Sequence, residues 1–205
     1  CGKVNPYKKA FGAMPPEVVH APFPNEMHGI TPEHSISVLE NMLRSSIDPE
    51  RVAAMIIEPV QGEGGFNIAP PEFLQKLREI CDTHGILLIA DEVQAGMART
   101  GKLFAFEHSG VAPDLVTMAK GLAGGFPLSA VTGRAEVVDA APVGGIGGTY
   151  AGNPLAVASA NAVFEVIEEE ALPPSAPEIG AKLQARPKAV AKRHSTGPSG
   201  EVPRV

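Results

Sequence analysis

Two short apolar runs with an amphipathic helical segment between them constrain the fold of this chain more than any other feature. Residues 52–57 (VAAMII) and 86–90 (ILLIA) are continuous apolar segments of strand length. Between them, residues 71–84 carry apolar side chains at helical spacing, and Gly85 follows where a helix commonly ends. A strand, a crossover helix and a second strand form a βαβ unit, so we expect a partly parallel sheet. Continuous apolar runs are typical of strands that are covered on both faces.

The rest of the chain extends this alternation of helices and strands. Each further segment has either an apolar run of strand length or apolar residues at helical spacing. We therefore expect an α/β core in which helices flank a mostly parallel sheet. The further elements that we expect are a helix over residues 32–43, strands over residues 114–119 and 128–132, and a long helix that begins at Asn153 and Pro154.

Charge and cysteine content exclude several classes of protein. The chain has 17 Lys and Arg residues against 23 Asp and Glu residues, a net charge of −6, so we expect no broad basic surface for nucleic acid or anionic lipid. The two cysteines, Cys1 and Cys81, are too few for a zinc framework or a disulfide scaffold. No apolar run has the length of a membrane span. Neither nucleic acid nor a membrane is an expected partner.

Three charged residues lie where apolar runs of the expected sheet end. These residues are Glu58, Asp91 and Lys120. In open α/β sheets the ligand crevice lies outside the carboxyl ends of the strands, so all three are candidates for a binding site. A carboxylate at such a position can equally bind the amides of a helix N-terminus, and for Glu58 and Asp91 this structural role stays open.

Lys120 is the most informative of the three. It lies between the apolar run 114–119 and the glycine-rich segment 121–125. Small residues let another molecule approach the backbone closely. Most isolated lysines are solvated surface charges, but a lysine in this setting is a candidate for a desolvated amine with a lowered pKa. Such an amine can act as a nucleophile or form a Schiff base.

Asp91, Lys120 and the loop over residues 144–149 together match the needs of pyridoxal 5'-phosphate. That cofactor needs a lysine that holds it as an imine and a carboxylate opposite its pyridine nitrogen. It also needs hydroxyl and amide donors for its phosphate. The sequence therefore offers a candidate for each of the three contacts.

A nucleotide hydrolase is the competing interpretation of the same region. Residues 86–92 resemble an apolar strand with an acidic pair that holds magnesium, and residues 96–102 resemble most of a phosphate loop. However, Leu103 stands where such loops carry the hydroxyl that binds magnesium, and the loop follows the acidic strand instead of preceding it. We therefore favour the pyridoxal-phosphate hypothesis.

Six short motifs follow one another along the chain: residues 57–65 (IEPVQGEGG), 88–94 (LIADEVQ), 99–101 (RTG), 119–121 (AKG), 124–127 (GGFP) and 147–154 (GGTYAGNP). Each is weakly specific alone, but the ordered set is highly specific. Over about residues 1–172 it resembles the class III pyridoxal-phosphate-dependent aminotransferases, and most closely the 4-aminobutyrate aminotransferases. The resemblance implies the central part of the large cofactor-binding domain of a fold-type I aminotransferase, with a mostly parallel sheet and flanking helices.

The resemblance implies a role in cofactor binding for five residues. Lys120 holds pyridoxal 5'-phosphate and then moves a proton between the substrate and the cofactor, while Asp91 pairs with the pyridinium nitrogen. Val93 packs against a face of the ring, and Gln94 contacts the phenolic oxygen of the cofactor. Thr149 binds the cofactor phosphate of the neighbouring subunit, which implies a homodimer with shared active sites.

The resemblance also implies the substrates. Glu58 lies near the substrate, and Glu63 pairs with a carboxylate-binding arginine that it releases when the dicarboxylate arrives. The implied reaction transfers the amino group of 4-aminobutyrate, or of a related ω-amino acid, to 2-oxoglutarate, which gives succinate semialdehyde and glutamate. Aminotransferases of the ornithine or acetylornithine type are the alternative within the class. The expected location is the cytoplasm.

The domain organisation that the resemblance implies is incomplete. Chains of the family extend beyond both ends of this one, so residues 1–172 are expected to be part of the large domain without its N-terminal portion. Residues 173–205 are expected to be the divergent start of a truncated C-terminal region. There, prolines interrupt a helix that could otherwise run from Glu178 to Lys192. Ala98 also stands where the family has glycine. An inactive cofactor-domain fragment is therefore a further alternative.

Overall fold

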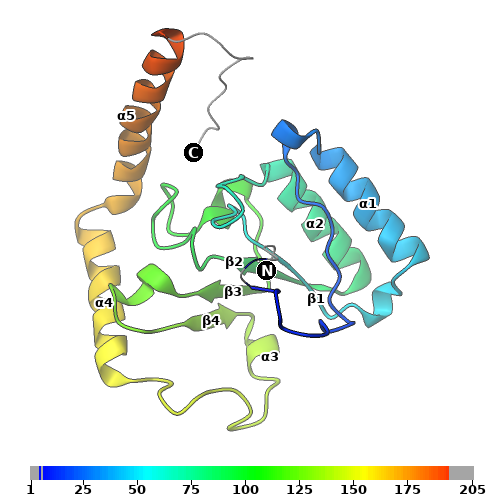
Figure 1. The fold of residues 1–205 in the computed structure, drawn as a ribbon. Coiled ribbons are helices and arrows are strands. Elements are labelled where there is room, and N and C mark those ends of the chain that lie inside the picture. Colours follow the sequence, from blue (N-terminus) through cyan, green and yellow to red (C-terminus); the bar gives the residue numbers. More distant parts are fainter. Residues whose placement is uncertain (1–4, 6, 194–205) are drawn as a thin grey trace.

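The computed structural model describes residue 5 and residues 7–193, with side chains up to residue 185. It has a mixed α/β fold built on one four-stranded sheet in the order β1-β2-β3-β4 (Figure 1). The first three strands are parallel to one another, and β4 pairs antiparallel with β3. The prediction of a mostly parallel sheet is thereby confirmed. The strands are β1 (Ala54–Ile57), β2 (Leu87–Asp91), β3 (Leu115–Met118) and β4 (Ala130–Gly133).

The helices agree with most of the sequence predictions. The predicted helices 32–43 and 71–84 are present, and so is the long helix that begins after Asn153. No helix within the described residues is both long and apolar enough to cross a membrane. The α-helices are α1 (Pro32–Ser45), α2 (Pro71–His84), α3 (Ala135–Val138), α4 (Pro154–Glu169) and α5 (Leu172–Arg193), and the 3-10 helices are η1 (Glu26–His28), η2 (Pro49–Arg51), η3 (Ala105–Ser109) and η4 (Lys120–Ala123).

Helix ends follow from capping chemistry in the sequence. The Thr31 hydroxyl accepts the His34 N–H at the start of α1, at 3.2 Å. The Asn153 side chain accepts the backbone N–H groups of the first turn of α4. Helix α2 ends at Gly85, which has a φ of +68° and so adopts the left-handed conformation that glycine tolerates best. These caps satisfy backbone groups that have no partner inside a helix.

Two groups of buried side chains form the core. One lies between β1 and β2 and the helices α1 and α2, which run side by side (Figure 1). Within it Cys81 is fully buried, and burial raises the pKa of its thiol to about 11, so it is a core residue as its sequence position predicts. The other group, which we call the β3 cluster, contains Ala90, Val116, Met118, Leu122, Ala123 and Ala160.

One face of the sheet is exposed among the described residues, contrary to the prediction that residues 52–57 are covered on both faces. Burial alternates along β1, and Ile56 is 63% exposed. Val131 on β4 is 58% exposed. The core clusters cover only the opposite face, to which Met55 and Ile57 point. The apolar run therefore predicted the strand correctly, but the prediction that both of its faces are covered was wrong.

The C-terminal region departs from the sequence prediction. We expected prolines to interrupt the tail, but α5 is one continuous helix over Leu172–Arg193 that projects from the end of α4 (Figure 1). Pro173 and Pro174 lie in its first turn, where a backbone N–H has no partner within the helix. Pro177 lies so close to Gly101 that a Cβ at residue 101 would contact its ring. The prolines at 198 and 203 lie outside the described residues.

A buried carboxylate joins the sheet to α2. The side chain of Asp114 is 5% exposed and accepts hydrogen bonds from Arg78 at 2.7 Å, Arg134 at 2.9 Å and the Leu88 N–H at 2.7 Å. Burial alone would raise the pKa of Asp114, but these donors outweigh it and lower the pKa to about 2. Asp114 is therefore an ionised link between α2, β2 and the residue that follows β4.

Candidate functional site

Register in the sheet brings Asp91 and Lys120 to the same edge. Asp91 is the last residue of β2 and pairs with Thr117 on β3. Lys120 follows Thr117 by three residues and begins η4. Because β2 and β3 are parallel, their carboxyl ends lie together. The two residues to which the sequence assigned the main chemistry therefore lie at adjacent strand ends.

The Asp91 carboxylate is held by two donors. Its Oδ1 accepts the Val93 N–H at 3.1 Å and the Thr117 hydroxyl at 3.3 Å. Both of these hydrogen bonds are accepted by Oδ1, so among the described residues the two donors fix the orientation of the carboxylate through that one oxygen. Sequence reasoning missed Thr117, although a hydroxyl inside an otherwise apolar strand was a visible signal. A carboxylate fixed in this way can present its other oxygen to a ligand.

Lys120 lies in a strained turn. Its φ is +49°, a left-handed conformation that side chains other than glycine rarely adopt. Strain of this kind is commonly found at functional sites. The side chain is exposed, and Nζ makes no hydrogen bond or ion pair to any described residue. The desolvation that we expected of this amine is therefore not provided by the described part of the chain.

The RTG motif lies against the AKG motif. A Cβ built on Gly121 would lie 3.3 Å from Arg99 Nη2 and 3.7 Å from Met97 Cβ. Two motifs that are separate in the sequence therefore meet beside Lys120. Ala98, which departs from the family pattern, has a φ of +67°, which explains why glycine suits that position.

Gln94 and Glu63 come together from two different loops. Gln94 Nε2 donates to Glu63 Oε1 at 3.3 Å. Gly62 lies directly against this pair, because a Cβ on residue 62 would overlap the Gln94 side-chain amide. The glycine in the residue 57–65 motif therefore leaves room for Gln94.

Replacing Gly62 with alanine is expected to displace the Gln94 amide from Glu63. The cost in stability should be about 1 kcal/mol or less, because the obstructed group is the end of a flexible side chain. NMR signals of the Gln94 side-chain NH₂ would report the displacement. The matched control is Gly64→Ala, where a Cβ would meet Gln61 and not Gln94. Unchanged Gln94 signals in Gly62→Ala would contradict this account.

Three further predicted residues have different settings. Glu58 Oε2 accepts the Gly62 N–H at 2.9 Å, so its carboxylate stabilises its own loop. Val93 is half-buried, two residues after the end of β2. Thr149 is exposed in the long loop between α3 and α4, and no hydrogen bond in the described structure links it to Asp91 or Lys120 (Figure 1). The roles of these residues toward a substrate or cofactor stay predictions.

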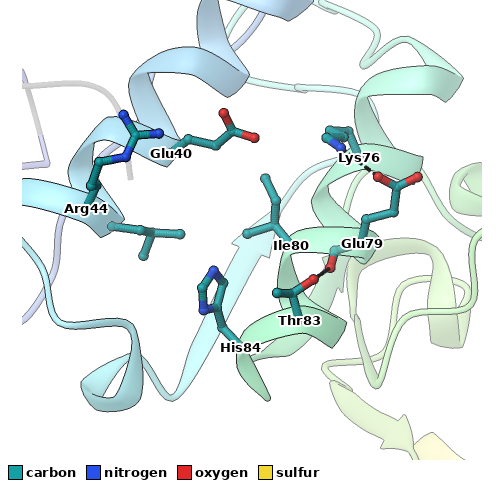
Figure 2. A pocket seen from close by; sticks show the side chains of 8 residues that line it. Glu40, Arg44, Lys76, Glu79, Ile80, Thr83 and His84 are labelled. Atoms are coloured by element: carbon teal, nitrogen blue, oxygen red, sulfur yellow. Dashed lines mark hydrogen bonds and ion pairs between the residues drawn. The ribbon is translucent and has the colours of Figure 1, made fainter.

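The surface groove between α1 and α2 contains none of the predicted site residues. It has a volume of about 470 Å³ and is lined by side chains of both charge signs, including Arg44, Glu40 and the Lys76–Glu79 ion pair (Figure 2). No group of acidic, histidine or cysteine side chains suited to a metal occurs among the described residues. The strand-end region is thus the better candidate site.

The residues at the strand ends fit pyridoxal phosphate by their chemistry. An oriented carboxylate can keep a pyridine nitrogen protonated, and an amine on a neighbouring strand end can hold the aldehyde carbon. The turn after Lys120 begins with Gly121, where the backbone can be approached closely. A mostly parallel α/β sheet with this pair at its carboxyl edge is typical of pyridoxal-phosphate-dependent enzymes.

Comparisons with known proteins agree with that class. Residues 1–199 match the family described as aminotransferase class-III. The chain is 53% identical to 4-aminobutyrate aminotransferase GabT of Escherichia coli K12, over 94% of this chain and 45% of that protein. It is 52% identical to 5-aminovalerate aminotransferase DavT of Pseudomonas putida KT2440, with the same coverage of 94% and 45%.

A solved structure supports the same conclusion. An amine transaminase from an uncultivated Pseudomonas species, in its pyridoxal-phosphate-bound form, matches with a TM-score of 0.82 and 34% identity over 92% of this chain and 46% of that one. The chain belongs to the class III aminotransferases, an enzyme family whose cofactor is pyridoxal phosphate. It spans about 45% of the length of the curated relatives it matches.

Proposed function

We propose that this chain supplies the cofactor-binding centre for transfer of an amino group from 4-aminobutyrate, or a related ω-amino acid, to 2-oxoglutarate. The products would be succinate semialdehyde and glutamate. The observation that carries the proposal is the placement of Asp91 and Lys120 at adjacent carboxyl ends of parallel strands. Identity of 53% to a 4-aminobutyrate aminotransferase supports the choice of reaction.

Each site residue has a defined task in this proposal. Asp91, oriented by Thr117 and Val93, pairs with the protonated pyridine nitrogen. Lys120 Nζ holds the cofactor and then moves the proton of the substrate carbon that carries the amino group. When bound, pyridoxal phosphate supplies an electron sink for that carbon. Val93 packs against the ring.

The proposed substrate preference rests on Glu58 and Glu63, the residues expected to lie near the substrate or its carboxylate. In this proposal Gln94 would contact the cofactor's phenolic oxygen, and its hydrogen bond to Glu63 would connect that contact to the substrate loop. Glu63 would pair with a carboxylate-binding arginine, and Glu58 would lie near the substrate. Relatives named for 4-aminobutyrate and 5-aminovalerate match almost equally, at 53% and 52% identity, so the proposal covers both ω-amino acids. Donors of the ornithine or acetylornithine type are the alternative within the class.

A homodimer with shared active sites is part of the proposal. Thr149 would contact the cofactor phosphate of the neighbouring subunit. Apolar side chains of the same loop support an interface there, because Val143, Ile146 and Tyr150 are at least three-quarters exposed. We also propose that residues 1–172 belong to the large domain, that residues 173–205 begin a C-terminal region, and that the protein acts in the cytoplasm.

An inactive cofactor-binding chain is the second candidate. The exposed position of Lys120 favours it, because a catalytic amine is usually desolvated. In that case the chain would bind pyridoxal phosphate without completing amino transfer.

A single-turnover assay separates the two candidates. The chain is loaded with pyridoxal phosphate and mixed with 4-aminobutyrate, 5-aminovalerate or ornithine, and the cofactor absorbance and the aldehyde product are followed. The proposed function predicts succinate semialdehyde from 4-aminobutyrate in an amount equal to the bound cofactor. A faster reaction with ornithine would reassign the donor. Cofactor binding without product from any donor would favour the inactive chain.

A further inference from the structure

Glu92, next to Asp91, is a carboxylate buried in the protein interior. It is 1% exposed, and its Oε1 accepts the Phe106 N–H at 2.8 Å. Its Oε2 is buried without a hydrogen-bond partner among the described residues. Burial raises the pKa of this carboxyl, although the backbone N–H groups of η3 oppose the shift. An acidic residue held inside at this cost needs a structural or functional reason.

Backbone contacts of Glu92 join three segments. Its N–H donates to the Thr117 carbonyl at 3.0 Å, and its carbonyl accepts the Gly96 N–H at 3.0 Å. Gly96 fits only because it has no side chain, since a Cβ there would lie 2.8 Å from the Glu92 carbonyl oxygen. Glu92 therefore fixes the start of the residue 93–104 loop to β3, while its side chain fixes the segment η3 beyond that loop.

The loop that Glu92 holds at both ends contacts the turn of Lys120. Met97, Phe104 and Phe106 pack against the β3 cluster, which includes Leu122 and Ala123 of η4. The rings of Phe104 and Phe106 are stacked with centroids 5.7 Å apart. Met97 and Arg99 also lie against Gly121. A continuous set of contacts thus runs from the Glu92 carboxylate to the residues that follow Lys120.

We propose that Glu92 is a positioning residue, which fixes the strained turn of Lys120 by accepting the Phe106 N–H and so holding the 93–104 loop and Phe106 against the β3 cluster. The proposal rests on the function proposed above only in assuming that Lys120 binds the cofactor. The effect of Glu92 on the conformation of the turn does not depend on that function. Glu92 makes no contact with the cofactor or substrate in this account.

Amide hydrogen exchange, measured without cofactor, tests whether Glu92 stabilises the turn of Lys120. Glu92→Leu removes the acceptor and leaves the Phe106 N–H unpaired in the interior. The Leu122 amide, which donates to Ala119 at 3.1 Å, is then expected to exchange about tenfold faster. Glu92→Gln keeps an acceptor oxygen and should stay within about twofold of the parent chain. If Glu92→Leu fails to fold, Glu92→Asp replaces it, because its shorter side chain keeps the charge and cannot reach Phe106.

Asp48→Leu is the matched control. Asp48 also accepts a backbone N–H at the start of a 3-10 helix, from Glu50 at 3.1 Å, but it lies at η2 and outside this set of contacts. Its loss should leave Leu122 exchange unchanged. The proposal would be overturned by equal exchange in Glu92→Leu and the parent chain, by equal acceleration in Asp48→Leu, or by exchange in Glu92→Gln as fast as in Glu92→Leu.

Covalent capture of pyridoxal phosphate by Lys120 adds a functional readout. After borohydride reduction, the rate of capture should fall about tenfold in Glu92→Leu and be restored in Glu92→Gln. If the parent chain captures no cofactor at Lys120, the proposed function fails, and the exchange data still decide the role of Glu92. If the parent chain and Glu92→Leu capture it at equal rates, only the positioning role fails.

Discussion

Replacement of Lys120 with alanine is expected to abolish specific capture of pyridoxal phosphate by this chain. The amine at residue 120 is the group that can form a covalent bond to the cofactor at the end of β3, beside the oriented Asp91. The parent chain should develop an absorbance band on addition of the cofactor, and borohydride should remove that band. In Lys120→Ala the band should be absent.

Exposed lysines make a control necessary, because pyridoxal phosphate reacts weakly with many surface amines. Lys182 on α5 is exposed and far from Lys120 along the chain, so Lys182→Ala should retain the band. Mass spectrometry of the reduced protein should place the label on residue 120. Identical spectra for the parent chain and Lys120→Ala would refute a competent site at this position.

Asp114→Ala is expected to cause the largest loss of stability, about 3–5 kcal/mol in the free energy of unfolding. The substitution leaves Arg78, whose side chain is 18% exposed, and the Leu88 N–H without their carboxylate partner. Urea unfolding followed by circular dichroism measures the change. Arg134→Ala is the control, because Arg134 is 55% exposed and its pair should contribute only about 1 kcal/mol or less. Similar losses in both variants would contradict the central position of Asp114.

The same residue predicts how stability depends on pH. The pKa of Asp114 is lowered to about 2 in the folded chain, against an ordinary value near 4 in the unfolded chain. The ionised form therefore stabilises the fold fully above pH 4, and this contribution, about 2 kcal/mol, is lost as the pH falls toward 2. Asp114→Asn should lack this acid dependence. Equal free energies of unfolding of the parent chain at pH 4 and pH 2 would contradict the stabilising role of the ion pairs that Asp114 makes with Arg78 and Arg134.

The parallel arrangement of β1 and β2 could be predicted from the sequence, because a strand, a helix and a second strand in succession can be connected in few ways. The apolar runs fixed which residues lie at strand ends, so Asp91 and Lys120 were identified before their neighbours were known. The roles proposed for them rest on their positions at strand ends together with the resemblance that six motifs in order carry. The contact between Gln94 and Glu63 was not predictable, since it depends on how two loops fold back.

Other features depend on what lies beside each residue in space. An apolar strand looks the same whether one face or both are covered, so the exposed position of Ile56 could not be read from residues 52–57. The hydroxyl of Thr117 and the carboxyl of Glu92 acquire their partners from segments distant in sequence. The start of α5 at Leu172 places Pro173 and Pro174 in a first turn, where proline is tolerated, but Pro177 and Pro187 lie further inside the helix, and nothing in the structure explains why α5 continues through them.

The uncovered face of the sheet affects how this chain behaves at different concentrations. Ile56 and Val131 lie on opposite edge strands with their side chains in water. Apolar surface of this kind favours self-association, and self-association increases with protein concentration. Spectra and exchange rates measured over a range of protein concentrations would therefore show whether this face associates with a second copy of the chain.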